Sequence, residues 1–347
     1  MTARFAPTGP APALERAEQL AERLLPERTP KKRMLVIVNP YATTVSDRLR
    51  NLVVYALQSR YEVEAVDTEK RDHATQICRE AAREGYDVVV AFGGDGTVNE
   101  AANGLAGSET PLTCLPGGST NVWCRTLGIP SDVVDATEHL LRIADDFRPR
   151  RVDLGSLRGE PSGPAPPLDE KLFVFSSGIG LDASVVERVD AHPYRKARLG
   201  PWYYTYAALA SFTRRYLVKP PRVRLEAGGR SVEAVTVIVQ NSDPFTFFSR
   251  RPIRTCEAAG LDTGTISLVA LKRATVLELP TLIPRLLSGR ARTVQRHRQV
   301  EGMPTVTEAR VVTADEGPFP VQVDGDYIGE FDRIQYGVLP GGLMAVA

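Results

Sequence analysis

The residues best suited to chemistry form a glycine turn, Gly93–Thr97 (GGDGT), directly after the apolar run Asp87–Phe92. Glycine tolerates positive φ and lets the backbone come close to a ligand, so the N–H groups of this turn can bind phosphate oxygens. Asp95 would repel a phosphate unless a cation lies between them, which indicates magnesium binding through water, or proton transfer. Thr97 followed by Glu100 matches a capping box with Thr97 as N-cap. The alternative is a tight strand-to-helix turn without a ligand.

A second turn, Leu115–Asn121 (LPGGSTN), also follows an apolar run and precedes a helical segment. Its glycines, two hydroxyls and amide suit the ribose and phosphates of a nucleotide. If both turns end neighbouring parallel strands, they face one crevice, which is where open α/β sheets bind ligands. The two turns together therefore predict a nucleotide site.

Alternating strands and helices must position these turns. Four apolar runs with helical segments between and after them predict a parallel sheet covered by helices on both faces. We expect this Rossmann-like, doubly wound α/β domain over residues 33–150. Its expected strands are Met34–Asn39, Tyr61–Asp67, Asp87–Phe92 and Leu112–Leu115, and its helices lie near 45–60, 72–84, 97–106, 121–127 and 131–144.

The pattern changes after residue 150. Short apolar runs separated by turns predict a β-rich, sandwich-like second domain over residues 151–347, with helices near 201–217 and 275–288. The pattern leaves open whether the last strand returns to the first domain. The expected strands are Arg151–Leu157, Lys171–Ser177, Arg222–Leu225, Val232–Gln240, Gly264–Leu271, Ala309–Thr313, Pro320–Asp324 and Ile334–Leu339.

Composition limits the partners. The formal net charge of +1 gives no global field that would favour nucleic acid. The four cysteines have neither metal-ligand nor disulfide-like spacing, which is typical of reduced thiols in the cytoplasm. No run of about 18 apolar residues occurs, so we expect no membrane span. A lipid substrate would then be reached from the side, by peripheral association with the inner face of the membrane.

Two further features concern contacts with other molecules. Leucine and alanine at helical spacing predict a helical leader over residues 1–32, which we expect to pack on the body or to pair with a second chain as a homodimer. Two basic stretches, Ala191–Leu225 and Arg285–Arg298, contain no acidic residue. They are either solvated surface or, if they share a face, a dock for anionic lipid.

Six motifs, in order, resemble the catalytic region of diacylglycerol kinases and their sphingosine- and ceramide-kinase relatives, a superfamily shared with NAD kinases. The longest are the two turns extended into their helices, GGDGTVNE over residues 93–100 and PGGSTNVWCRTLGIP over residues 116–130. The others are Asn39-Pro40, Val152–Gly155 (VDLG), Gly178–Ala183 (GIGLDA) and Val323–Asp326 (VDGD), so the resemblance spans residues 34–340.

The resemblance implies roles for individual residues. Asp95 and Asp153 would share a magnesium-and-water network, with Asp95 also catalytic. Asp326 would be the general base that takes the proton of a lipid hydroxyl. Asp182 would contact the substrate, or would instead cap the helix that begins there. The ATP site would comprise Asn39, Gly93, Gly94, Gly96, Thr97, Glu100, Gly118, Ser119 and Asn121.

Two positions depart from the family pattern. Val122 stands where many bacterial members have an aspartate, so one acid of the metal network is missing. Asp326 is one methylene shorter than the usual glutamate. These departures favour a nucleotide- or lipid-binding regulator without the chemistry as one alternative.

The resemblance implies an ATP- and Mg²⁺-dependent lipid kinase, with diacylglycerol as the leading acceptor and phosphatidic acid as the product. A sphingoid base, ceramide or another long-chain alcohol is the nearest alternative acceptor. NAD kinases also carry GGDGT, but the later motifs follow the lipid-kinase arrangement.

Overall fold

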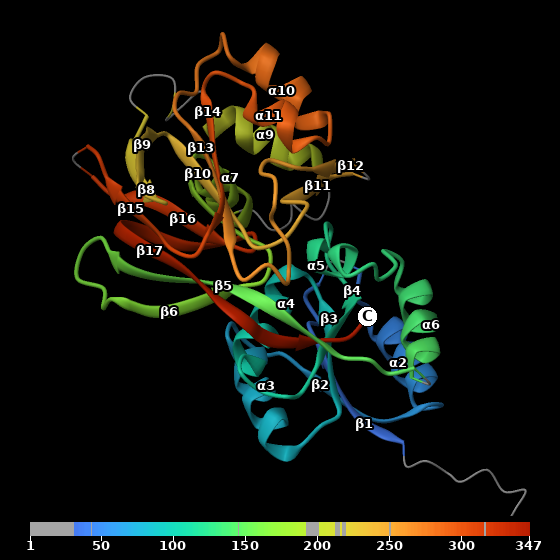
Figure 1. The fold of residues 1–347 in the computed structure, drawn as a ribbon. Helices are drawn as coiled ribbons and strands as arrows, with labels where there is room; N and C mark the ends of the chain where they lie inside the picture. The colour runs from blue at the N-terminus through green and yellow to red at the C-terminus, as the bar shows by residue number, and fades with distance from the viewer. Residues whose placement is uncertain are drawn as a thin grey trace, which may run out of the picture.

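The computed structural model describes residues 31–42, 44–144, 146–191, 201–211, 216, 220–249, 251–315 and 317–347. The leader predicted over residues 1–32 therefore lies outside the described residues, except for its last two. Part of the basic stretch Ala191–Leu225 also lies outside them. Figure 1 shows an α/β half, coloured blue to green, beneath a β-rich half, coloured light green to red.

The first half is a parallel four-stranded sheet in the order β2-β1-β3-β4. Its central strands are continuous apolar runs, as parallel strands buried on both faces require, and Val36 and Val90 are fully buried. Helices α3 and α4 lie on one face, and α2 and α6 on the other (Figure 1). The bounds are β1 (Lys32–Val38), β2 (Tyr61–Asp67), β3 (Val88–Gly93), β4 (Leu112–Pro116), α2 (Asp47–Leu57), α3 (His73–Glu84), α4 (Asp95–Leu105), α5 (Val122–Thr126) and α6 (Val133–Ile143).

The second half is β-rich, and the predicted combination of an α/β domain with a sandwich-like domain is confirmed. Its strands are β5 (Arg150–Pro161), β6 (Leu168–Phe173), β7 (Ser176–Gly180), β8 (Val223–Ala227), β9 (Arg230–Ala234), β10 (Thr236–Gln240), β11 (Thr246–Phe248), β12 (Arg251–Ile253), β13 (Ile266–Leu271), β14 (Val300–Val306), β15 (Ala309–Thr313), β16 (Phe319–Val323) and β17 (Asp326–Ala345). The helices are α7 (Leu181–Asp190), α9 (Pro201–Ser211), α10 (Leu279–Leu287) and α11 (Ala291–Gln295).

The last strand joins the two halves. β17 pairs antiparallel with β5, β15 and β16, and its end at Ala345 pairs in parallel with Leu112 of β4. Its register against β5 shifts between Leu339 and Leu343, where Gly341 has a φ of 58°. A bulge of this kind bends a strand, and here it redirects β17 from the sandwich into the parallel sheet.

Several expected strands differ in extent. Lys171–Ser177 is divided into β6 and β7, because the backbone N–H groups of Val174 and Phe175 donate to the Asp324 carboxylate at 2.7 and 3.0 Å. Val232–Gln240 is likewise divided into β9 and β10. The strand β14 and the hairpin of β11 and β12 were not predicted, because their short runs lack a clear alternation of apolar and polar residues.

Candidate active site

The glycine turn after β3 leads directly into α4, which begins at Asp95 with Gly94 as its N-cap. No side chain caps this helix. The prediction that Thr97 is the N-cap is therefore wrong, because the N-cap lies three residues earlier, at Gly94. The first N–H groups of an uncapped helix need an acceptor, and they suit an anion.

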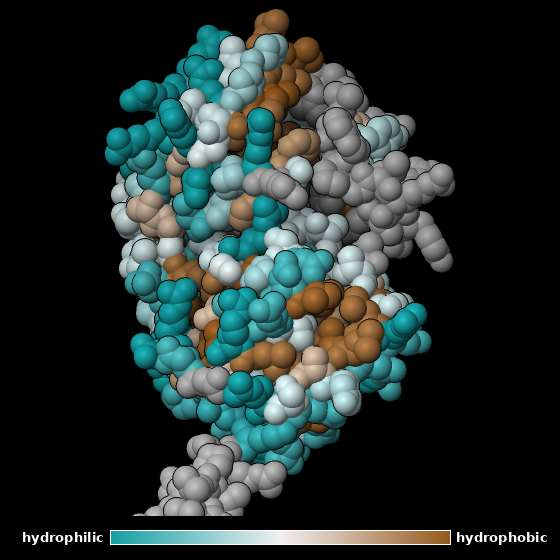
Figure 2. Space-filling view, turned by 90° about the vertical axis from the view of Figure 1, so that its right-hand side faces the viewer, coloured by the Kyte–Doolittle hydropathy of each residue, from teal (hydrophilic) through white to brown (hydrophobic). Residues whose placement is uncertain are grey.

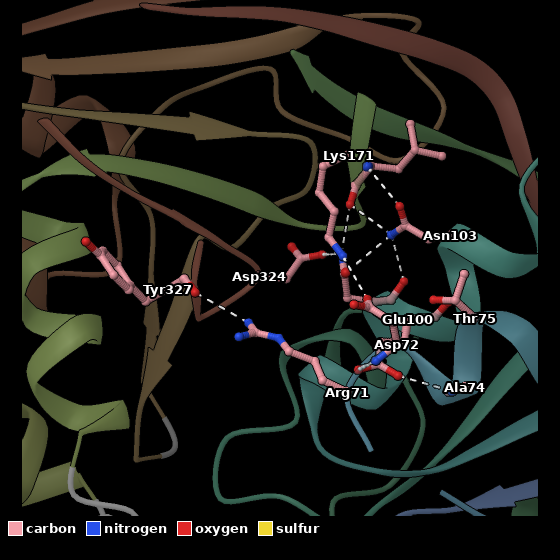
Figure 3. Close-up of polar contacts among 11 residues, drawn as sticks. Arg71, Asp72, Ala74, Thr75, Glu100, Asn103, Lys171, Asp324 and Tyr327 are labelled. Carbon is pink, nitrogen blue, oxygen red and sulfur yellow. Dashed lines mark hydrogen bonds and ion pairs between the residues drawn. The ribbon is translucent and has the colours of Figure 1, made fainter. Parts of the chain in front are cut away.

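The capping-box role predicted for Glu100 is wrong as well. Its carboxylate accepts from the N–H of Asp72 at 2.9 Å and from that of Ala74 at 3.2 Å, so it holds the start of α3 against α4. Figure 3 shows Glu100 turned toward Asp72 and Ala74. Glu100 is also absent from the cavity described below, so the structure does not bring it to the predicted nucleotide site.

The two glycine turns touch each other through their backbones. The N–H of Gly117 donates to the carbonyl of Gly93 at 2.8 Å, and a Cβ added at Gly118 would lie 2.8 Å from Cα of Gly94. Only glycine allows this approach. Asn121 has a φ of 49°, and its side chain bonds both the N–H and the carbonyl of Gly118 at 2.8 Å. Asn121 therefore shapes the second turn and does not line the cavity.

Asn39, at the end of β1, completes this region. Its amide donates to Oγ1 of Thr97 at 3.2 Å, which ties β1 to the start of α4. A Cβ added at Gly93 would lie 2.5 Å from the same Oγ1. Gly93 therefore has no side chain that would block this contact. Asn39 and Thr97 themselves line the cavity.

Asp326 is brought to the same place from the far end of the chain. A Cβ added at Gly96 would lie 2.7 Å from Oδ2 of Asp326, so this carboxylate lies against the first turn of α4. Asp95 and Asp326, 231 positions apart by their numbers, both line one cavity. The structure thus brings together the two residues predicted to be catalytic.

Asp324 holds Asp326 in position, and sequence reasoning assigned it no role. Its fully buried carboxylate accepts from the backbone N–H groups of residues 174–176 at 2.7 to 3.0 Å and from the Asn99 amide of α4 at 2.7 Å. Burial raises the pKa of Asp324 to about 7, although all four donors favour the ionised form. Its φ of 47° turns the chain so that Asp326 points to α4. The Asp-Gly pair of the VDGD motif was the available signal for such a turn.

Contacts between the two halves of the molecule lie around the turn that carries Asp326. Figure 3 shows the Arg71 side chain reaching the carbonyl oxygen of Tyr327, at the start of β17, and the bond is 3.4 Å long. Lys171 pairs with Asp72 at 3.8 Å. The turn that carries Asp326 is attached to the α/β half on both of its sides, by Asn99 at Asp324 and by Arg71 at Tyr327, and the neighbouring strand β6 is attached through Lys171.

One cavity of about 1000 Å³ connects these groups with a long apolar region. Its polar end is formed by Asn39, Gly94–Thr97, Gly118–Thr120 and Asp326. Its apolar end lies in the second half, between α7, β13 and α10. The side chains of this apolar end include Leu181, Val185, Phe247, Val269, Leu271, Leu279, Leu282 and Leu286.

Asp182 lies in the first turn of α7 and lines the cavity. The N-cap of α7 is Gly180, so the capping alternative for Asp182 is wrong. Its Oδ2 accepts from Nε2 of Gln322 at 2.8 Å. Burial raises the pKa of Asp182 to about 6, against the lowering effect of that hydrogen bond. Asp182 therefore places a polar group in the cavity wall.

Asp153 is not brought to the cavity. Its two oxygens accept from the N–H of Gly264 at 2.6 Å and from that of Gly341 at 2.8 Å, so it pins the bulge of β17. Asp95 lines the cavity and accepts from the N–H of Trp123 at 3.1 Å. In the described part of the chain, no three His, Cys, Asp or Glu side chains gather where they could hold a metal ion.

Together, the fold and the cavity define a two-domain protein of the diacylglycerol kinase and NAD kinase type. The diacylglycerol kinase catalytic domain family matches residues 33–157, and the YegS C-terminal NAD kinase β-sandwich-like domain matches residues 176–347. The first half of the chain therefore resembles a diacylglycerol kinase catalytic domain, and the second half resembles the YegS C-terminal domain.

Individual relatives agree with this assignment. A diacylglycerol kinase of Staphylococcus aureus (strain JH9) is 34% identical over 133 residues, which are 37% of this chain and 40% of that protein. The chain thus spans less than half the length of this curated relative. The same holds for the diacylglycerol kinase of S. aureus strain bovine RF122, which is 35% identical over 135 residues.

Solved structures share the fold. A Bacillus anthracis protein provisionally assigned as a diacylglycerol kinase superposes with a TM-score of 0.67 at 24% identity, covering 92% of this chain and 98% of that one. A yeast NADH kinase in complex with NADH superposes with a TM-score of 0.50 at 11% identity, covering 92% and 84%. At these identities the likeness concerns the fold alone.

Proposed function

We propose that the protein is an ATP- and Mg²⁺-dependent lipid kinase that phosphorylates the hydroxyl group of diacylglycerol to give phosphatidic acid. The observation that carries this proposal is the single cavity with a backbone-rich polar end and a long apolar end. A phosphate donor and a chain of hydrocarbon can occupy one such cavity at the same time. Both halves of the molecule contribute to its walls.

The polar end fits the triphosphate of ATP. The uncapped start of α4 and the adjoining glycine turn present backbone N–H groups, and Gly94 and Gly118 leave no side chain between the backbone and a phosphate. Magnesium typically keeps several waters and binds through one or two carboxylates plus phosphates, so it needs no cluster of protein ligands. Asp95 would hold it there; Asp153, with both oxygens bonded to backbone N–H groups, fits this role less well.

The transfer requires a group that takes the proton of the acceptor hydroxyl. Asp326 is placed for this, because its carboxylate lies at the polar end of the cavity and adjoins Gly96. The hydroxyl oxygen forms the new bond to phosphorus as its proton passes to Asp326, and ADP leaves. Bound Mg²⁺ would offset phosphate charge during this step. Most of the rate enhancement then comes from positioning and electrostatics.

The apolar end favours a lipid acceptor over NAD. An adenine dinucleotide is polar along its length, and the leucine and valine side chains of α7, β13 and α10 offer it few partners. Sphingosine, ceramide or another long-chain alcohol is the second candidate, since Asp182 offers a polar group within this lining.

None of the helices in the described residues is long and apolar enough to cross a membrane. We propose that the protein works in the cytoplasm and visits the inner face of the membrane to collect its acceptor. A homodimer formed through the leader stays a prediction.

The discriminating experiment measures ADP release from ATP and Mg²⁺ with a panel of acceptors: diacylglycerol, sphingosine and ceramide in mixed micelles, and NAD in solution. We expect product with diacylglycerol. Product with sphingosine or ceramide alone would move the assignment to the second candidate. Turnover of NAD alone would overturn the lipid proposal, and binding of ATP without turnover of any acceptor would indicate a regulator.

A further inference from the structure

We propose that the turn Thr275–Glu278, together with the exposed side of α10, inserts into the surface of an anionic lipid bilayer and so places the apolar end of the cavity against the membrane. This inference rests on the proposed lipid-kinase function, because it states how the acceptor would enter. The partner is a bilayer that contains anionic lipid.

The tip of this turn exposes two large apolar side chains. Leu277 is 85% exposed and Val276 is 54% exposed, and neither lines the cavity. Leu277 is the most exposed large apolar side chain of the described residues. Leaving such groups in water is unfavourable, whereas a lipid surface would bury them.

The turn is held in this shape by hydrogen bonds. The N–H of Glu278 donates to the carbonyl of Thr275 at 3.0 Å, which closes the turn around Val276 and Leu277. The buried carboxylate of Glu278 is fixed in turn by Arg298 at 2.6 Å and by His297 at 3.2 Å. The two apolar side chains are therefore presented outward by an anchored turn, so inserting them requires little further ordering.

The exposed apolar surface continues into the cavity. Ile283 of α10 is 48% exposed and also lines the cavity, and Leu279, Leu282 and Leu286 line it from the same helix. Figure 2 shows apolar side chains gathered at the top of the molecule, the end that carries α10 in Figure 1. The apolar side chains of α10 therefore connect the exposed surface at Ile283 with the apolar end of the cavity.

Charges around the patch match an anionic bilayer. Arg273, Arg290 and Arg296 are exposed and make no ion pair with a described residue. The predicted dock over Arg285–Arg298 contains three further arginines, but Arg292 pairs with Glu257 at 2.6 Å, Arg298 pairs with Glu278, and Arg285 donates to the carbonyl of Thr281 at 2.7 Å. Arg273 precedes the turn by two residues, and Arg290 and Arg296 follow α10 in the chain, so cationic side chains accompany the apolar patch, which suits anionic headgroups.

The test compares Leu277→Asp with the wild-type chain by co-sedimentation with phosphatidylcholine vesicles, with and without phosphatidylglycerol. Burying the leucine contributes part of the affinity and an inserted carboxylate opposes it, so we expect binding to fall by roughly tenfold or more. Leu277→Phe should bind like the wild type. Arg290→Glu should weaken binding only to the vesicles that contain phosphatidylglycerol.

Leu52→Asp is the matched control, since Leu52 is 58% exposed on α2 in the other half. Equal binding of Leu277→Asp and the wild-type chain would overturn the inference. A change of oligomeric state in Leu277→Asp, seen by light scattering without lipid, would also overturn it, because the patch would then be a self-interface. Vesicle binding requires no turnover. It can therefore be measured separately from kinase activity, which is assayed with a short-chain diacylglycerol dispersed in water. That activity should persist in Leu277→Asp.

Discussion

The two ends of the cavity are built by different means. The polar end consists of backbone groups from two glycine turns and the start of α4, in which a single methyl group added at Gly96 or Gly118 would collide with a neighbour. The apolar end consists of side chains from separate segments, including Leu181, Val269 and Leu282. A backbone-built surface is specified by short contiguous motifs, whereas a side-chain surface depends on packing across the fold.

This difference has a functional consequence. The polar end can vary little in sequence, because its shape depends on glycine. The apolar end can exchange one hydrophobic side chain for another of similar volume at low cost. We therefore expect substitutions at the polar end to abolish chemistry, and substitutions at the apolar end to change which acceptor binds.

The largest expected effect belongs to Asp326. Asp326→Asn removes the proton acceptor while keeping nearly the same shape, and general-base catalysis contributes roughly 10²- to 10⁴-fold. We expect kcat to fall by about 10³-fold in an assay with diacylglycerol micelles. Near wild-type turnover would remove Asp326 from the mechanism and weaken the contrast between the two ends.

Asp326→Glu is the matched variant for this test. It keeps a carboxylate, one methylene longer than that of Asp326, so it should retain much of the activity. The melting temperature of both variants should match that of the wild type, because Asp326 is half-buried while Asp324 anchors the turn.

Gly96→Ala should have the next largest effect. The added Cβ would lie 2.7 Å from Oδ2 of Asp326 and would force that carboxylate away. A displacement of about 1 Å at a reacting group can cost on the order of 10²-fold in rate, and we expect a loss of that size. Gly107→Ala is the control, because nothing lies within 4 Å of the added methyl, although its φ of 76° adds strain. Equal activities of the two variants would contradict the proposed contact.

Sequence motifs located most residues of the polar end, because its turns are contiguous in the chain. Their glycines indicate places where one backbone segment comes close to another or to a ligand. The motifs failed for Glu100, Asn121 and Asp153, whose polar side chains bond backbone groups of the protein, in neighbouring segments for Glu100 and Asp153 and within its own turn for Asn121. Residue type indicates that a carboxylate needs donors, but only the fold decides whether a ligand or a backbone N–H supplies them.

The apolar end was not predictable in the same way. Its lining comes from α7, the hairpin of β11 and β12, β13 and α10, and the hairpin was not foreseen. Each of these segments reads as ordinary core in the sequence. Their common cavity arises from the order of the strands in the sheet, which periodicity does not reveal.

Asp182 lies in the cavity wall, and its titration shows whether a buried carboxylate there destabilises the folded protein. Its pKa is raised to about 6 from 3.8, mainly by burial, so the folded state binds this proton more tightly than the unfolded state does. The resulting stability is complete below pH 3.8 and is lost as the pH rises through about 6. Asp182→Asn should remove up to about 2 kcal/mol of this pH dependence, measured by urea unfolding between pH 4 and 7.

The raised pKa of Asp324 contributes in the same direction and persists in this variant, so some slope should remain. Asp262→Asn, at an exposed position of the same half, is the control and should leave the profile as in the wild type. A pH profile in Asp182→Asn as steep as that of the wild type would show that Asp182 is not desolvated.

The smallest expected effect concerns the link between the two ends. Arg125 of α5 lies over the ring of Phe247 at 3.5 Å and donates to the carbonyl of Ser249 at 2.9 Å, so it ties the turn-bearing half to the β11–β12 hairpin. Phe247 lines the cavity. Arg125→Met should loosen this wall at a cost of about 1 kcal/mol, raising KM for diacylglycerol roughly fivefold and leaving KM for ATP unchanged.

Arg142→Met on α6 is the matched control for Arg125, because Arg142 is an exposed arginine of the same half whose ion pair with Glu138 lies away from the cavity lining. It should change neither constant. If Arg125→Met raised KM for ATP and for diacylglycerol equally, the two ends would respond as one unit. The division between a backbone-built polar end and a side-chain-built apolar end would then describe their construction but not their behaviour.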